Sequence, residues 1–337
     1  MHYIRYEYFS EVYPRCNVFK IREKTDLQTY TLHESLPNII KQSNEYPKYD
    51  HFFLLDESRF SFFRCDISQE FSEPITIQVL NEIIQEKIKE TRCTHSIDGI
   101  VVTNYIDTIF VNSEQKQFLI GQKGQIFFRL YIVYLRNQAL NMFNSVYGHV
   151  LGYQQIQILP QSFHTVFFLR ESLKKENFVL LYITENYCKA ISIKNGFYSG
   201  FDTINLGISS LKQMYKDNGV VQYRYKEYQS IEANPLAKSL VVDTIEFYAD
   251  LLSKRLMEKG LSGSDVIVIS PITKNEHFIE IFDKSYRKIS NNYILPFHHS
   301  DLLNTFERNR EPEDMDSLIF VNQEPKIRKV LLGEEDN

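Results

Sequence analysis

The stretch from residue 178 to residue 211 constrains the fold of this chain more than any other. It reads as an apolar strand that begins at Phe178, a tight turn, a second strand, an Asn195-Gly196 turn, a third strand, and a helix after Gly207. An Asn-Gly pair between two strand-like runs is a strong signal of a β-hairpin. The stretch therefore predicts three antiparallel strands followed by a helix.

Composition excludes several classes of protein. The chain has 337 residues, 43% of them hydrophobic, which gives room for buried cores in about two or three domains. A net charge of −5 without a basic stripe argues against a nucleic-acid partner. No secretory signal opens the chain, and no window has the length of a membrane span. The four cysteines, Cys16, Cys65, Cys93 and Cys188, lie far apart and show no CxxC spacing. We therefore expect neither a zinc site nor a disulfide framework, and we expect the protein to be in a reducing cytoplasm.

The first 150 residues predict strands followed by a mixed unit. Aromatic and polar residues alternate over residues 1–72, which indicates antiparallel strands, and residues 52–66 read as a hairpin that turns near Asp56. After Pro74 an apolar stripe with helical spacing begins, and Thr76 is its expected N-cap. Strand-like runs and a second helix follow, which together predict a compact inserted α+β unit, at residues 97–111, 125–135 and 137–147.

The region after the stretch at 178–211 predicts an alternation of helices and strands. Leu236 to Lys259 is the strongest helix of the sequence, with apolar residues spaced for one buried face. Val266 to Ile269 is a short, continuously apolar run, typical of a strand that is covered on both faces. A helix at 277–289, an edge strand at 293–297 and a helix at 300–308 complete the prediction.

The order of these elements carries a resemblance. The helix after Pro74 is followed by Asn104-Tyr105, the Gly121–Gly124 turn, Leu159-Pro160-Gln161-Ser162, three strands and Gly207. In this order the chain resembles the bacterial actin-like family that includes FtsA and PilM. The resemblance implies an α/β fold of the actin-like (RNase H-like) type, with two lobes and an inserted α+β subdomain. The implied boundaries are residues 1–73 for the start of the first lobe, 74–153 for the inserted subdomain, 154–177 for the return to the first lobe, 178–310 for the second lobe, and 311–337 for a flexible acidic tail.

The nucleotide motifs of that family are altered here. Family phosphate hairpins use an aspartate for the metal's water and glycines that let backbone N–H groups approach phosphate. This chain has Thr184 and Glu185 without a glycine at the second-lobe hairpin, no glycine before Gly99, and Ser270-Pro271 in place of a glycine pair. Thr184, Glu185 and Gly207 are thus remnant phosphate-loop positions. We expect no cofactor and no enzymatic activity; the alternative is ATP with Mg²⁺.

The resemblance also implies a role. PilM-like proteins are cytoplasmic platforms of type IV pilus assembly that capture the tail of an inner-membrane partner in a groove of the inserted subdomain. An extended tail would add main-chain hydrogen bonds to an exposed strand within residues 97–135. We expect that surface to include Asn104, Tyr105, Phe128 and Leu130. The protein would then be cytoplasmic and recruited to the inner face of the membrane, and self-association into a homo-oligomer stays open.

Other classes compete with this scaffold hypothesis. One is an FtsA-like division protein or an ATP-binding, filament-forming actin homologue. Another is an enzyme on an RNase H-like core, which needs convergent carboxylates, and Glu185 and Asp202 are the candidates. Cys188 is interpreted as a buried strand residue and His298-His299 as a solvated loop, because neither has the spacing of a nucleophile or metal site.

Overall fold

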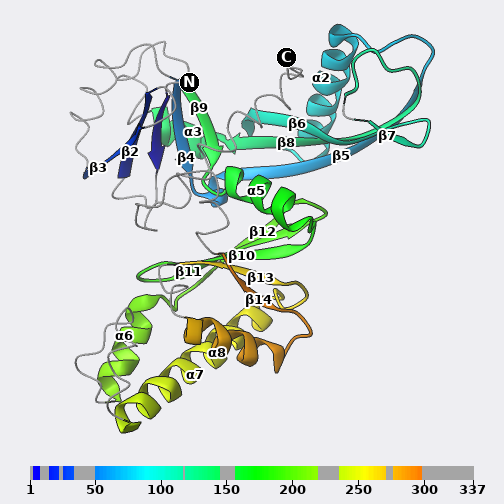
Figure 1. The fold of residues 1–337 in the computed structure, drawn as a ribbon. Helices are drawn as coiled ribbons and strands as arrows, with labels where there is room; N and C mark the ends of the chain where they lie inside the picture. The colour runs from blue at the N-terminus through cyan, green and yellow to red at the C-terminus, as the bar shows by residue number, and fades with distance from the viewer. Residues whose placement is uncertain are drawn as a thin grey trace. The chain divides into compact units, whose positions relative to one another are not determined.

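The structure, a computed structural model, describes residues 3–7, 15–22, 26–33, 50–116, 118–144, 156–218, 235–270 and 276–297. The described residues fall into two compact units that are divided between His164 and Thr165 (Figure 1). The predicted helix at 300–308, the acidic tail at 311–337 and the His298-His299 pair lie outside the described residues.

The first unit contains a five-stranded mixed sheet in the order β3-β2-β1-β4-β9. The first three strands form an antiparallel meander, whereas β4 is parallel to β1 and β9 is parallel to β4. The strands are β1 Tyr3–Glu7, β2 Arg15–Arg22, β3 Asp26–His33, β4 Asp50–Leu55 and β9 Ile156–Pro160.

The second unit repeats this topology. Its sheet has the order β12-β11-β10-β13-β14, with an antiparallel β10-β11-β12 meander and with β13 and β14 parallel to β10. Counted along the chain, both sheets follow the order 3-2-1-4-5 with the same strand directions. This duplication is the actin-like (RNase H-like) two-lobed fold that the sequence predicted. The strands are β10 Phe178–Ile183, β11 Cys188–Lys194, β12 Phe197–Ile204, β13 Val266–Ile269 and β14 Ile294–Pro296.

An α+β subdomain is inserted between β4 and β9 of the first unit. Its four-stranded sheet has the order β5-β8-β6-β7, and helix α2 lies against one face (Figure 1). Thr76 is the N-cap of α2, as expected: its hydroxyl accepts the Val79 N–H at 3.2 Å. The elements are β5 Phe60–Phe71, α2 Ile77–Thr94, β6 Gly99–Val111, β7 Glu114–Lys116, β8 Gly124–Arg136 and α3 Asn137–Phe143.

The start of this subdomain differs from the expectation. Residues 52–66 do not form a hairpin, because β4 belongs to the five-stranded sheet and β5 pairs with β8 in the inserted one. A 3-10 turn at Glu57–Arg59, in which the Asp56 carboxylate accepts the Ser58 N–H at 2.9 Å, separates the two strands. The inserted sheet therefore begins at Phe60, and the boundary placed at residue 74 is too late.

Three helices cover one face of the second-unit sheet (Figure 1). They are α6 Ile208–Asp217, α7 Pro235–Glu258 and α8 Glu276–Arg287, and α7 agrees with the predicted helix from Leu236 to Lys259. Apolar side chains from all three pack against alternate residues of β10, β11 and β13, such as Val179, Leu181 and Val268. The other face of β10 is also buried, as the apolar run predicts for a strand that is covered on both faces.

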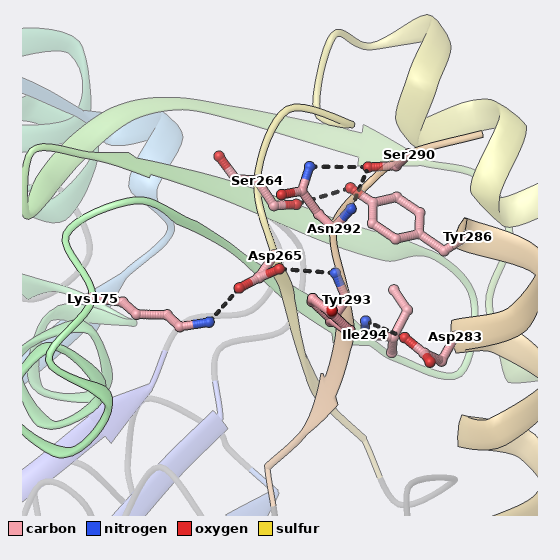
Figure 2. A network of polar contacts seen from close by, with 9 residues as sticks. All are labelled: Lys175, Ser264, Asp265, Asp283, Tyr286, Ser290, Asn292, Tyr293 and Ile294. Carbon is pink, nitrogen blue, oxygen red and sulfur yellow. Dashed lines mark hydrogen bonds and ion pairs between the residues drawn. The ribbon is translucent and has the colours of Figure 1, made fainter. Parts of the chain in front are cut away.

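A polar network ties together the amino ends of β10, β13 and β14 (Figure 2). Asp265, just before β13, forms an ion pair with Lys175 and accepts the Tyr293 N–H at 2.8 Å. On the other side of β14, Asp283 of α8 accepts the Ile294 N–H at 2.8 Å. Side chains thus accept backbone N–H groups of the short strand β14 and of the residue before it from two directions.

Candidate functional site

The carboxyl ends of β10 and β13 form the end of the second-unit sheet at which a ligand is expected. In an open α/β sheet, ligands bind outside the carboxyl ends of the parallel strands, often at the N-terminus of a following helix. Here β10 is followed by the turn Thr184–Tyr187, β13 is followed by Ser270, and α6 begins after Gly207. These are the segments that contain the predicted remnant positions.

The turn that follows β10 is closed on itself. The Thr184 N–H donates to the Tyr187 carbonyl at 2.9 Å, and the Thr184 hydroxyl donates to the same oxygen at 2.7 Å. The Tyr187 N–H in turn donates to the Thr184 hydroxyl at 3.3 Å. The hydroxyl of Thr184 is therefore engaged within the turn as both donor and acceptor.

The N-terminus of α6 packs directly on this turn. Ile208 N–H donates to the Thr184 carbonyl at 2.9 Å, and Ser209 N–H donates to the Glu185 carbonyl at 2.7 Å. The next two amides, of Ser210 and Leu211, donate to the Gly207 carbonyl at 3.0 and 3.4 Å. The first four N–H groups of a helix are the donors that usually bind an anion. In α6 backbone carbonyls accept from the amides of the first three residues, Ile208 to Ser210, and the Leu211 amide makes the first regular hydrogen bond of the helix.

Gly207 is required by this contact. A Cβ at this position would lie 2.4 Å from the Asn186 carbonyl carbon and 2.5 Å from both the Glu185 oxygen and the Tyr187 nitrogen. These neighbours are backbone atoms, which cannot rotate away as a side chain can. The φ of Gly207 is −98°, which any residue adopts, so close approach and not backbone conformation explains the glycine. The glycine thus allows the turn Thr184–Tyr187 of the same chain to contact the start of α6.

Glu185 places a negative charge beside the start of α6. Its carboxylate accepts from Lys212 at 2.7 Å and from the Ser209 hydroxyl at 2.9 Å. The hydrogen bond from Lys212, and secondarily the one from Ser209, holds the pKa of Glu185 below its usual value, although partial burial opposes the shift. A carboxylate at a helix N-terminus takes the electrostatic role that a bound phosphate would have, and it repels a second anion. Sequence reasoning missed Ser209 and Lys212, whose three-residue spacing on the first turns of a helix was the available signal.

The side chains of Cys188 and Tyr248 are buried behind the site and bind the same backbone carbonyl. The Cys188 thiol donates to the Leu206 carbonyl at 2.7 Å, and the Tyr248 hydroxyl donates to the same oxygen at 3.0 Å. Burial raises the pKa of Cys188 to about 12 and that of Tyr248 well above its usual value. Cys188 is thus a protonated, buried strand residue, as expected, because a nucleophile requires the thiolate. On the β13 side, the Ser270 hydroxyl donates to the Ile183 carbonyl at 2.9 Å.

The carboxylates that an RNase H-like enzyme would need are engaged separately. Glu185 is paired with Lys212, whereas Asp202 of β12 forms an ion pair with Lys259 at 3.0 Å. Among the described residues, no three His, Cys, Asp or Glu side chains gather in a way that could hold a metal ion. In the same part of the chain, no helix is both long and apolar enough to cross a membrane.

The residues expected at a partner surface are mostly in the core. Phe128 and Leu130 of β8 are fully buried against α2, and Tyr105 of β6 is 3% exposed, with its ring stacked on Tyr131 at 4.8 Å. The expected surface role of these three residues needs correction: all three side chains are buried, and β8, which carries Phe128 and Leu130, is an inner strand with neighbours on both edges. Asn104, on β6, is half-buried.

The outer edge of β6 has less strand cover than the edges of β8 within the part of the chain that the structure describes. Among the described residues only β7 pairs with that edge, and it covers no more than Ile109–Val111. The register of β6 with β8 shifts between Val101 and Thr103 and again between Asp107 and Ile109, and Thr108 lies in the left-handed region with a φ of 52°. Five regular residues, Thr103 to Asp107, remain between the two bulges.

Comparisons with known proteins give distant structural likeness alone. No protein-family model matches the chain, and no curated protein sequence matches it. A Listeria monocytogenes protein described as a candidate N-acetylmannosamine kinase is 9% identical with a TM-score of 0.49, over 97% of this chain and 100% of that one. A PilM-PilN type IV pilus biogenesis complex is 9% identical with a TM-score of 0.45, over 96% and 98%. The cytoplasmic domain of EpsL, an inner-membrane component of the Vibrio cholerae type II secretion system, is 9% identical with a TM-score of 0.37, over 99% and 95%.

At 9% identity these structures are no evidence of a shared activity. The fold is identified by the duplicated strand order of the two sheets.

Proposed function

We propose that this protein is a non-catalytic, actin-like scaffold that binds the tail of a membrane partner on the cytoplasmic side of a membrane, in the manner of PilM-like platforms. The observation that carries the proposal is the closed start of α6. The amides of its first three residues, Ile208 to Ser210, have backbone acceptors, and Glu185 holds a carboxylate beside them. A nucleotide phosphate would have to displace the turn and face that carboxylate.

The edge of β6 supports the second half of the proposal. An extended peptide can add a strand to a sheet edge that has free backbone N–H and C=O groups. Thr103 to Asp107 of β6 is a regular segment of five residues that includes the half-buried Asn104, and the backbone groups of alternate residues point toward that edge. The two bulges limit the added strand to this length, which suits the short tail of a membrane protein.

Two binding measurements test this function. Isothermal titration calorimetry with Mg²⁺ and ATP is expected to detect no binding at millimolar nucleotide, whereas micromolar affinity, or ATP-dependent polymer in a pelleting assay, favours the ATP-binding filament class. A panel of N-terminal tail peptides from membrane proteins should yield a binder that slows hydrogen exchange at residues 103–107. Protection elsewhere in the chain, or no binder while soluble partners are captured, overturns the scaffold reading.

A further inference from the structure

The two edges of the inserted sheet are built differently. β5 forms one margin of that sheet (Figure 1), and its pairing with β8 runs without a register shift from Phe60↔Leu135 to Phe71↔Gly124. Among the described residues, no strand pairs with its outer edge. β6, at the other side, has two bulges and a partial cover from β7.

β5 lacks several of the features that protect an edge strand, although it has the charged residues Arg64, Asp66 and Glu70. Proteins block such edges with bulges, prolines, lysines or very short strands, because a long regular edge is a template for pairing with another chain. β5 has 12 residues, no bulge against β8, and no proline or lysine. Over its length, alternate backbone N–H and C=O groups point outward from the sheet.

The charges on β5 are arranged so that the strand complements itself. Arg64 and Asp66 lie on the face opposite α2, with side chains 31% and 41% exposed, and they contact each other at 3.3 Å. In an antiparallel pairing of two β5 strands about a two-fold axis through Cys65, Arg64 of each copy lies directly opposite Asp66 of the other. Opposite charges at directly facing positions stabilise such a pair, whereas like charges destabilise it.

Neighbouring registers lack this complementarity. A two-fold axis through Arg64 sets two arginines face to face, and an axis through Asp66 sets two aspartates face to face. On the α2 face, the Cys65 register also places Phe63 of each copy opposite Ile67 of the other, and both residues belong to the apolar side of the sheet.

We propose that the outer edge of β5 is a homodimerisation surface that takes a second copy of this chain, antiparallel and centred on Cys65, so that two inserted sheets join into one. Dimerisation through β5 leaves the edge of β6 accessible in each copy. Mutations can therefore test dimerisation at β5 and peptide binding at β6 separately.

A charge exchange tests the register. Sedimentation equilibrium of the wild-type protein is expected to show a dimer, and Arg64→Asp or Asp66→Arg should each weaken it by about tenfold or more, because each places like charges opposite. The double variant Arg64→Asp/Asp66→Arg restores both pairs and should recover most of the affinity. Circular dichroism checks that each variant is folded, since Asp66 also contacts Arg129 at 3.3 Å.

Crosslinking gives an independent measurement. Facing residues of an antiparallel pair have Cα atoms about 4.5 to 5.5 Å apart, within the range of a disulfide. In a Cys16→Ser/Cys93→Ser background, a mild oxidant or a short bis-maleimide should therefore link two chains through Cys65. Three results would overturn the proposal. The wild-type protein could be a monomer at 100 micromolar, the single variants could dimerise as well as the wild type, or the crosslink could persist in a Cys65→Ser variant. Tail-peptide binding at β6 should not change in the Arg64→Asp variant, so the two proposals fail independently.

Discussion

The two ends of the second-unit sheet are held together by different means. At the carboxyl end backbone atoms make the close contact between α6 and the turn after β10, because amides of α6 donate to carbonyls of the turn at a distance that only a glycine at position 207 permits. The Glu185 side chain adds contacts to Ser209 and Lys212. At the amino end side chains add to the backbone hydrogen bonds of the strands, with Asp265 and Asp283 each accepting a backbone N–H of β14 or of its preceding residue (Figure 2). Side chains can be exchanged for others that bond similarly, but a close backbone contact cannot.

The difference bears on function because the carboxyl end is where a ligand would bind. A phosphate could bind there only if the hydrogen bonds between the first turn of α6 and the turn after β10 were broken. At the amino end, Asp265 and Asp283 bind groups of the protein itself. The comparison predicts that substitutions at the carboxyl end are costly where they separate the backbones and mild where they change only a side chain.

The largest effect is expected for Gly207→Ala. The added Cβ would overlap three backbone atoms of the turn at 2.4 to 2.5 Å, so α6 must move away and its amide hydrogen bonds must lengthen. Overpacking of this kind costs about 3 kcal/mol. Urea unfolding of the purified protein measures the loss.

Gly200→Ala in β12 is the matched control, because a Cβ there meets nothing within 4 Å. Its free energy of unfolding should stay within about 0.5 kcal/mol of the wild type. Equal losses for both variants would show that α6 does not depend on close contact with the turn.

A smaller effect is expected at the amino end, for Asp265→Ala. The substitution leaves the Tyr293 N–H without its acceptor and removes the partner of Lys175. Losing the acceptor of a backbone amide near the surface costs about 2 kcal/mol. Asp265→Asn keeps an acceptor oxygen and removes only the charge, and because Lys175 is 40% exposed, this variant should lose under about 1 kcal/mol. Equal losses for Ala and Asn would assign the contribution to the ion pair and not to the amide.

The sequence predicted the second lobe well because its signals are local. Asn195-Gly196 fixes a hairpin, and the apolar spacing of α7 and the run of β13 each specify one element. The start of the inserted subdomain was misplaced because β5 pairs with β8, a strand about 60 residues further along the chain, and strand pairing at that separation has no local signal.

The candidate site was predicted only in part, for a similar reason. Thr184, Glu185 and Gly207 do come together, but the nature of their contact depends on the distance between two backbones. Phe128 and Leu130 read equally well as surface or core, because alternation in a strand does not say which face is covered.

The smallest effect is expected for Glu185→Gln, which changes the charge at the carboxyl end without moving the backbone. Glutamine keeps an acceptor for Ser209 and Lys212, so the lost contribution is the charge alone. Because the Glu185 side chain is 54% exposed, solvent screening limits the difference in unfolding free energy to about 0.5 kcal/mol at pH 7.

The pH dependence of that difference identifies its cause. The pKa of Glu185 is lowered in the folded state from the usual 4.5, so the folded protein releases this proton more readily than the unfolded chain. The stabilisation is therefore fully present above that value and is lost as pH falls through the lower folded pKa. Wild type and Glu185→Gln should differ at pH 7 and converge as pH falls through the folded pKa of Glu185, and high salt should narrow the gap at pH 7. In a Lys212→Gln background the gap should shrink. A gap that persists at low pH would mean that glutamine disturbs the turn itself, which would weaken the distinction between backbone and side-chain contacts at the two ends of this sheet.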